Sequence, residues 1–165
     1  IASTVRAVVG QRLVRKLVPE SVDSYEPDET TVKRIEAAFG IDGEEGMAEV
    51  HKLELQAIEG KVGVTPVTTQ AVPGNEPSTT ESSISRLWRI KGESGLTSFR
   101  GRVGIYEVLD MSSEIQKLIT SGSSSETLQA QAIKDGMITM QKDGFIKALR
   151  GQTTLEEVMR VTSER

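Results

Sequence analysis

The side chains that could carry out acid–base or metal chemistry in this 165-residue chain are carboxylates, arginines and one histidine. Because His51 is the sole histidine and cysteine is absent, neither a Cys–His pair nor a two-histidine metal site can be built. His51 lies in an acidic segment and is predicted to be an ordinary surface side chain. The pairs Glu44/Glu45 and Glu156/Glu157 are predicted to be solvated charges at helix starts, which the helix dipole favours. We therefore predict no catalytic residue and no metal site in the chain.

Glycines can mark phosphate-binding loops, but the required pattern does not occur. No Gly-x-x-x-x-Gly-Lys-Ser/Thr motif, whose backbone amides cradle phosphates, is found in the sequence. Gly92, Gly95, Gly101 and Gly104 are interpreted as turn and close-packing residues. Glu107 is more unusual, because a carboxylate within an apolar strand needs a partner. The ordinary alternatives are that its side chain faces solvent or pairs with an arginine.

Four cations interrupt the apolar residues near the start of the chain: Arg6, Arg12, Arg15 and Lys16. They could form a face for phosphates or nucleic acid, or make ion pairs within or between subunits. We favour ion pairs, because cations interleaved with apolar residues more often pair within or between subunits, and a net charge of −4 argues against attraction to nucleic acid. Trp88 has no aromatic neighbour with which to stack bases, and it is predicted to be a core residue. No nucleic-acid partner is predicted.

A small α+β fold, mostly helical, is expected to position these side chains. Residues 3–17 are predicted to form a helix, whose apolar residues occupy several faces, as is typical of a helix buried on several sides. Further helices are predicted over Glu29–Phe39, which Gly40 would end, and over Met47–Ile58. The acidic segment 42–59 is expected to be a solvated face.

The second half of the chain begins with a change of composition. Residues 63–83 are dominated by Thr, Ser, Pro, Gly and Gln and cannot bury enough surface to offset their ordering entropy, so they are predicted to be a flexible linker or long loop. Strands are predicted at Arg86–Ile90 and Arg102–Leu109. Helices are predicted at 114–120, 127–135, 138–150 and after Thr153, with Ser113, Ser123 and Thr153 as N-terminal caps.

Composition also limits the kinds of protein to which the chain can belong. Apolar residues make up 36% of the chain and aromatic residues 4%, which suggests that part of it is not packed or that its core is completed by residues elsewhere. No apolar run approaches the roughly 20 residues of a membrane-spanning helix, so a cytoplasmic location is expected. The first residue, Ile1, suggests a segment of a longer protein.

Several motifs resemble, in order and spacing, those of the type II secretion and type IV pilus assembly ATPases. Gln11-Arg12-Leu13 is similar to the Gln-Arg-Leu element near the end of that family's RecA-like core. The segment Gly101–Leu109 resembles its Gly-Arg-x-Gly-Ile-Tyr-Glu strand. Gly136–Met140, Asp143-Gly144 and Thr153–Glu157 resemble parts of its C-terminal helical subdomain.

The resemblance implies a division of the chain. Residues 1–17 would be the terminal helix of the RecA-like α/β ATPase core, and residues 86–110 a strand pair of that core. Residues 111–165 would be the C-terminal helical subdomain. Between them, residues 18–62 would form an acidic helical insertion and residues 63–85 a flexible linker.

Relatives commonly hold a zinc ion with two Cys-x-x-Cys pairs on either side of this interval. Alignment by the flanking motifs places Val18 and Ser21 at the first pair, and Lys91 and Ser94 at the second. None of these residues can replace a thiolate ligand. We therefore expect no zinc, and the insertion would replace the zinc-binding hairpin.

The resemblance implies that the full-length protein is an ATPase that uses ATP and Mg, whereas this segment, whose Walker motifs would precede Ile1, is expected to be inactive alone. The whole would be a hexamer, peripheral at the cytoplasmic face of the inner membrane, that powers type II secretion or type IV pilus assembly. Its partners would be its own subunits, the inner-membrane platform protein and other secretion or pilus components. This segment would serve in subunit contact and structure.

Arg12 and Arg102 are the candidate site residues. They would pair with carboxylates across a subunit interface, lie near nucleotide phosphates, or form ion pairs within the domain. Two other functions stay open: a stand-alone non-catalytic adaptor and a pilus retraction ATPase. An upstream Walker A motif would favour the motor, and a start codon just before Ile1 the adaptor.

Overall fold

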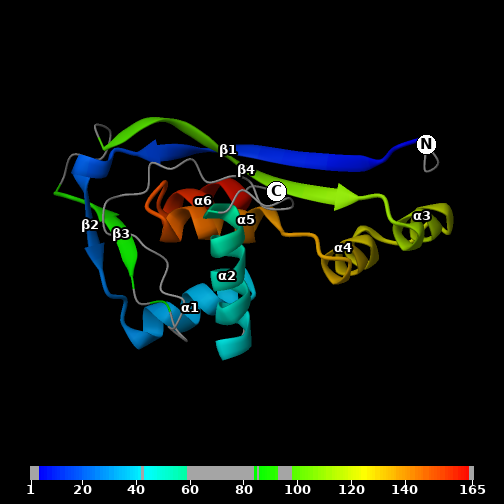
Figure 1. The fold of residues 1–165 in the computed structure, drawn as a ribbon, viewed down its shortest axis with the longest axis horizontal. Coiled ribbons are helices and arrows are strands. Elements are labelled where there is room, and N and C mark those ends of the chain that lie inside the picture. The colour runs from blue at the N-terminus through cyan, green and yellow to red at the C-terminus, as the bar shows by residue number, and fades with distance from the viewer. Residues whose placement is uncertain (1–3, 42, 59–83, 85, 93–97, 164–165) are drawn as a thin grey trace.

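A long two-stranded antiparallel ribbon organises the molecule. The structure is a computed structural model that describes residues 4–41, 43–58, 84, 86–92 and 98–163. Strand β1 (Ala7–Leu17) pairs with β4 (Phe99–Asp110), from Ala7 opposite Asp110 to Leu17 opposite Phe99. In Figure 1 this ribbon runs along one side of the molecule, with helices α5 and α6 against its middle. Segments far apart in the sequence therefore lie side by side.

The helix predicted over residues 3–17 is wrong, because most of this segment is β1. On the side of β1 that faces the helices, Val14 is fully buried, whereas on the other side Val9 and Leu13 are 60% and 48% exposed. Side chains of a strand alternate between two faces. Apolar residues spaced in this way fall on several faces of a helix if the segment is taken to be helical, which explains the wrong prediction. The strand's partner lies roughly eighty residues further on, so no local signal announces the pairing.

A second, shorter ribbon lies at one end of the first. A single 3-10 turn (Pro19–Ser21) leads into β2 (Val22–Tyr25), which pairs antiparallel with β3 (Leu87–Ile90). The strand predicted at Arg86–Ile90 is confirmed, but β3 and β4 do not form a pair with each other. Each pairs with a strand from the first part of the chain.

Helices α1 (Glu29–Phe39) and α2 (Gly43–Ile58) confirm the predicted helices there. Asp28 caps α1, and Gly40, with φ +64°, ends it. Both helices pack on α5 (Met140–Leu149), and the ring centroids of Phe39 and Phe145 lie 4.9 Å apart. The expectation of a solvated face over residues 42–59 is wrong in part, because α2 buries the following residues in the core: Met47, Val50, Leu53 and Glu54.

Most of the predicted linker 63–85 lies outside the described residues. Ile84 is the exception: it is 4% exposed and belongs to the main hydrophobic core. That core joins the first part of the chain to the C-terminal helices, since it also contains Ile35 of α1 and Phe145 of α5.

The C-terminal helices are confirmed, with small shifts of their caps. They are α3 (Ser113–Thr120), α4 (Ser125–Lys134), α5 and α6 (Leu155–Ser163). Ser112, Ser124 and Thr154, rather than the predicted Ser113, Ser123 and Thr153, supply the oxygens that accept from the first-turn amides. Adjacent Ser or Thr residues offer equivalent hydroxyls, so the motif alone cannot select between them.

Close packing joins α5 to α6. Gly144 lies in the middle of α5, where a Cβ would come within 2.6 Å of Val158 Cγ1. Glycine at this position lets the two helices approach each other beneath the ribbon. Among the described residues, no helix has both the length and the apolar character needed to cross a membrane.

Candidate functional site

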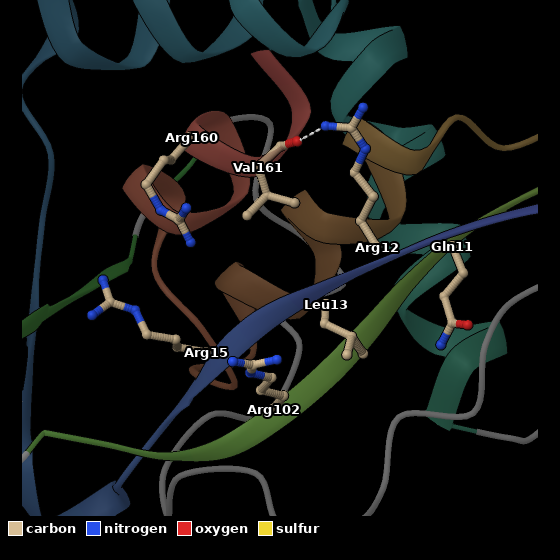
Figure 2. A pocket seen from close by; sticks show the side chains of 7 residues that line it. All are labelled: Gln11, Arg12, Leu13, Arg15, Arg102, Arg160 and Val161. Carbon is tan, nitrogen blue, oxygen red and sulfur yellow. Dashed lines mark hydrogen bonds between the residues drawn. The ribbon is translucent and has the colours of Figure 1, made fainter. Parts of the chain in front are cut away.

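The predicted candidates Arg12 and Arg102 line one open hollow of about 730 Å³ beside β1, β4 and α6. We call it the arginine hollow, and its lining residues are Gln11, Arg12, Leu13, Arg15, Arg102, Arg160 and Val161. Figure 2 shows that β1, β4 and α6 each contribute at least one arginine to it. Sequence reasoning missed Arg160, because only the fold brings α6 beside β1.

Arg12 holds two elements together. Its Nη1 donates a hydrogen bond to the carbonyl oxygen of Val161, in the last turn of α6 (Figure 2). Carbonyls at a helix C-terminus carry partial negative charge and lack intrahelical donors, so a guanidinium stabilises them. This contact lies within the domain, and the role of Arg12 in function stays a prediction.

Arg102 lies directly opposite Arg15 in the β1–β4 ladder. It is exposed, and its side chain makes no hydrogen bond or ion pair with the part of the chain that the structure describes. Two like charges at directly opposed positions of a ladder repel each other. This pair therefore concentrates positive charge at one edge of the hollow.

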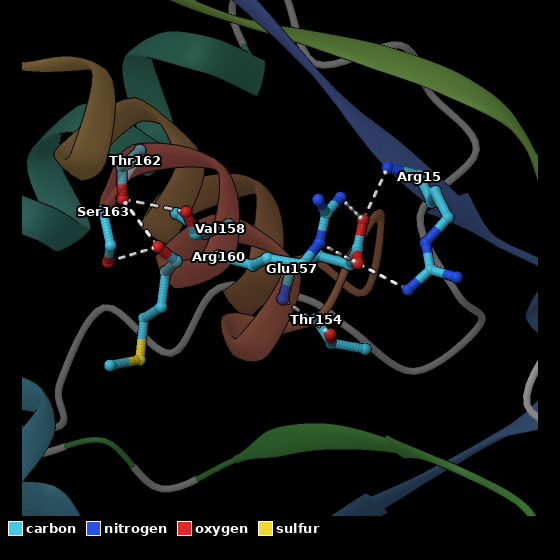
Figure 3. A network of polar contacts seen from close by, with 8 residues as sticks. Arg15, Thr154, Glu157, Val158, Arg160, Thr162 and Ser163 are labelled. Atoms are coloured by element: carbon cyan, nitrogen blue, oxygen red, sulfur yellow. Dashed lines mark hydrogen bonds and ion pairs between the residues drawn. The ribbon is translucent and has the colours of Figure 1, made fainter. Parts of the chain in front are cut away.

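Glu157 supplies the opposing charge beside the hollow. One of its oxygens accepts from Arg15 Nη2 at 2.5 Å and from Arg160 Nε at 3.1 Å, and the other accepts from the Arg15 amide at 3.2 Å (Figure 3). The Glu157 side chain is 3% exposed, which corrects the prediction that Glu156 and Glu157 are both solvated; Glu156 alone is exposed. The hydrogen bond from Arg15 is the main cause that lowers the pKa of Glu157 to about 2.

Arg15 is fixed from two sides. Its guanidinium lies 4.2 Å from the centre of the Phe99 ring and also pairs with Glu157. A cation above an aromatic face is attracted by the ring's quadrupole. The side chain of Arg15 is thus positioned before any ligand or partner arrives.

The middle of β4 is fixed by α5. The amide of Tyr106 donates to Asp143 Oδ2 at 2.8 Å, and the same oxygen lies 2.5 Å from Lys147 Nζ. Both side chains of this pair are buried, and burial is the main cause that lowers the pKa of Lys147. Glu107 neither faces solvent alone nor pairs with arginine, because its Oε2 accepts from the Met140 amide at the start of α5 at 3.3 Å. These carboxylates secure the strand that carries Arg102.

The prediction that His51 is an ordinary surface side chain is wrong. Its side chain is 14% exposed, and Nδ1 lies 3.5 Å from Glu54 Oε2. Glu54 also faces Arg150, at 3.9 Å, across the contact between α2 and the end of α5. Burial is the main cause that raises the pKa of Glu54, and it outweighs the opposing effects of Arg150 and His51. The cluster joins α2 to the end of α5, and none of its residues lines the arginine hollow.

Three of the four positions that the resemblance aligns with zinc ligands, Val18, Ser21 and Lys91, are joined by hydrogen bonds. The Ser21 hydroxyl donates to the carbonyl of Val18 at 2.7 Å and lies 3.2 Å from that of Ser98. The Lys91 amide donates to the Ser21 carbonyl. Ser94 lies outside the described residues. Within the described part of the chain, no group of three or more His, Cys, Asp or Glu side chains is placed to hold a metal ion.

Trp88, predicted to be a core residue, is 8% exposed and packs with Leu17 and Val22. Its Nε1 donates to the carbonyl of Leu149 at 2.9 Å, at the end of α5. The prediction is confirmed, and the residue links the small β2–β3 ribbon to the C-terminal helices.

Comparison with known proteins agrees with the motifs. The sequence model of a family described as "Type II/IV secretion system protein" matches residues 1–160. The Type II secretion system protein E of Xanthomonas campestris pv. campestris is 28% identical over 165 residues, which cover 99% of this chain and 22% of that protein. The Type IV pilus assembly ATPase PilB of Thermus thermophilus is 29% identical over 166 residues, which cover 99% of this chain and 14% of that protein.

A shorter stretch is more similar to the Type IV pilus assembly ATPase PilB of Pseudomonas aeruginosa, with 41% identity over 66 residues, 40% of this chain and 12% of that protein. The chain spans less than a quarter of the length of each of these relatives. The family match, in contrast, extends over nearly the whole chain and includes both long strands. The chain therefore belongs to the family of type II/IV secretion system proteins.

Proposed function

We propose that this chain is part of an ATPase that powers type II secretion or type IV pilus assembly. The observation that carries the proposal is the family match over residues 1–160, together with relatives named as secretion proteins and pilus assembly ATPases. ATP and Mg would be bound by parts of the full-length protein outside this sequence, which has no P-loop motif. The motor would be a hexamer at the cytoplasmic face of the inner membrane, working with the platform protein there.

In this motor the β1–β4 ribbon would form an edge of the RecA-like core. The ribbon's outer face supports this role, because Val9, Leu13 and Val108 are each about half exposed there. Neighbouring apolar residues on one sheet face are a common mark of a surface that another part of a protein covers. Helices α3 to α6 would form the C-terminal subdomain that supports the ribbon from its inner side.

Arg102 would act at the contact between subunits. It is exposed on β4, and Glu157 is already shared by Arg15 and Arg160. A carboxylate on a neighbouring subunit could therefore pair with Arg102. Arg12 would act indirectly, because its contact with Val161 holds α6 against β1.

The test is charge reversal in the full-length protein. Arg102→Glu should lower ATP turnover and ring formation by about tenfold or more, since a like-charge contact replaces an attractive one. Ring formation is measured by sedimentation and turnover by phosphate release. Arg89→Glu is the matched control, because Arg89 is also an exposed strand arginine but lies on β3. Wild-type assembly and turnover by Arg102→Glu would exclude Arg102 from the subunit contact.

A further inference from the structure

One edge of the β1–β4 ribbon is open along the first part of β1. In an antiparallel ladder, successive residues direct their N–H and C=O groups alternately towards the partner strand and away from it. The Met111 amide donates to the Arg6 carbonyl at 3.0 Å, so every second residue from Arg6 bonds to β4 and those between them point outwards. The outward residues in this part of the strand are Ala7, Val9, Gln11 and Leu13. Within the part of the chain that the structure describes, their outward amides and carbonyls have no hydrogen-bond partner.

The remainder of this edge is occupied by α6 and the turn that precedes it. The amide of Arg15, the next outward residue, donates to Glu157 Oε2 at 3.2 Å (Figure 3). The Leu17 amide donates to the carbonyl of Gln152 at 2.9 Å. These hydrogen bonds leave no free donor there for another strand, so the open stretch ends at Leu13.

The opposite edge of the ribbon, along β4, is occupied in its middle. The outward amide of Tyr106 donates to Asp143 Oδ2 on α5 at 2.8 Å. A strand could add along this edge only if that hydrogen bond broke and α5 moved away from β4. The edge that is ready to accept a strand is therefore the one on β1.

The open edge lacks the features that usually prevent strand pairing, which are charged side chains, proline and bulges. Residues 7–13 contain no proline and one charged side chain, that of Arg12. Arg12 donates to the Val161 carbonyl on α6, and the register shift of the ladder lies beyond this stretch. Val9 and Leu13 are 60% and 48% exposed, so a strand beside them would bury apolar surface as well as form hydrogen bonds.

We propose that residues 7–13 of β1 receive a third strand from the rest of the full-length protein, and that Glu157 marks the point at which this pairing ends. The partner is an extended segment with apolar side chains on the outer face, where they would lie beside Val9 and Leu13. This inference rests on the proposed function in taking the strand from a longer protein. The chain spans less than a quarter of the length of each relative described above.

Hydrogen–deuterium exchange of the amides in residues 7–13 tests the pairing. The outward amides should exchange about a hundredfold or more slowly in the full-length protein than in the 165-residue chain, because only there would they be hydrogen-bonded. The amides that face β4 are the internal reference, since they are bonded in both proteins.

A pair of proline substitutions identifies the edge. Val9 and Val108 lie directly opposite each other, and the amide of each points away from the partner strand. Val9→Pro should speed exchange at Gln11 and Leu13 about tenfold or more in the full-length protein, because proline removes a donor to the third strand. In the 165-residue chain, where that amide faces solvent, the change should stay within about twofold. Val108→Pro should leave exchange at Gln11 and Leu13 within about twofold in both proteins.

Three results would overturn the proposal: equal exchange of the outward amides in both proteins, loss of protection in Val108→Pro but not in Val9→Pro, or protection in the 165-residue chain that rises with its concentration. The last would identify a second copy of this chain as the partner. ATP turnover is measured separately. A full-length protein with slow exchange but no turnover would refute the motor and keep the third strand, and fast exchange with normal turnover would do the reverse.

Discussion

Glu157→Gln is the substitution that should most weaken the attachment of α6 to β1. The change keeps the size of the side chain and removes the charge that Arg15 and Arg160 share. Since the pKa of Glu157 is lowered from 4.5 to about 2, the folded state favours the ionised form by about 3 kcal/mol. The side chains of Arg15 and Arg160 are 42% and 53% exposed, so solvent screens the pair, and we expect a loss of about 2 kcal/mol in the free energy of unfolding at pH 7.

The lowered pKa of Glu157 also determines how its contribution to the free energy of unfolding changes with pH. The pKa of Glu157 is lower in the folded than in the unfolded chain, so the unfolded chain takes up the proton first as the pH falls. The stability that Glu157 contributes is therefore complete above about pH 4.5 and is lost as the pH falls towards 2. The difference between the two proteins should shrink to less than about half of its neutral value by pH 3.

Urea unfolding from pH 7 to pH 3, followed by the fluorescence of Trp88, the sole tryptophan, measures this difference. Glu29→Gln is the control, because Glu29 pairs with Lys33 at 2.6 Å but both side chains are exposed, and it should leave stability unchanged. Equal stability of Glu157→Gln and the unaltered chain at pH 7, or a difference that stays constant down to pH 3, would refute the reasoning.

Two further substitutions test the packing beneath the ribbon. Gly144→Ala should lower the melting temperature, because its Cβ would lie 2.6 Å from Val158 Cγ1, and the overpacking cost of about 1–3 kcal/mol exceeds the roughly 1 kcal/mol gained in helix propensity. A raised melting temperature would show that α5 and α6 are not in close contact. Trp88→Phe should cost about 1–2 kcal/mol in urea unfolding followed by circular dichroism, since it removes the buried hydrogen bond from Nε1 to the carbonyl of Leu149. Unchanged stability would mean that this hydrogen bond contributes nothing.

Local signals predicted the helices well and the ribbon in part. Helix α1 has the bounds that the sequence predicts, because Gly40 marks its end, and the segment Arg102–Leu109 is predicted as a strand and lies within β4. Residues 7–17 were mistaken for a helix because what makes them a strand is β4, a partner distant in the sequence. Even the strand at Arg86–Ile90 could be predicted without its partner β2, since strand propensity is local and pairing is not.

The candidate site could be predicted only in outline. Arg12 and Arg102 were singled out by motif, and the structure brings both to one hollow, but their functional role stays a proposal. Glu157 resembled a solvated charge because it follows a helix start, and only the approach of α6 to β1 buries it. Its spacing from Arg160, one turn further along α6, was a signal that could have indicated a paired charge.

The ladder between β1 and β4 has a consequence for how this chain tolerates change. The ladder ends where Leu17 pairs with Phe99, so the chain between these two residues leaves and returns at the same end of the ribbon. Loop-closure entropy grows only slowly with length, and doubling the loop would cost about 0.6 kcal/mol. Insertions and deletions in this interval are therefore thermodynamically mild, provided that α1, α2 and β3 keep their core contacts. The same long separation delays folding, because the two halves of the ribbon must find each other across the whole loop before their hydrogen bonds can form.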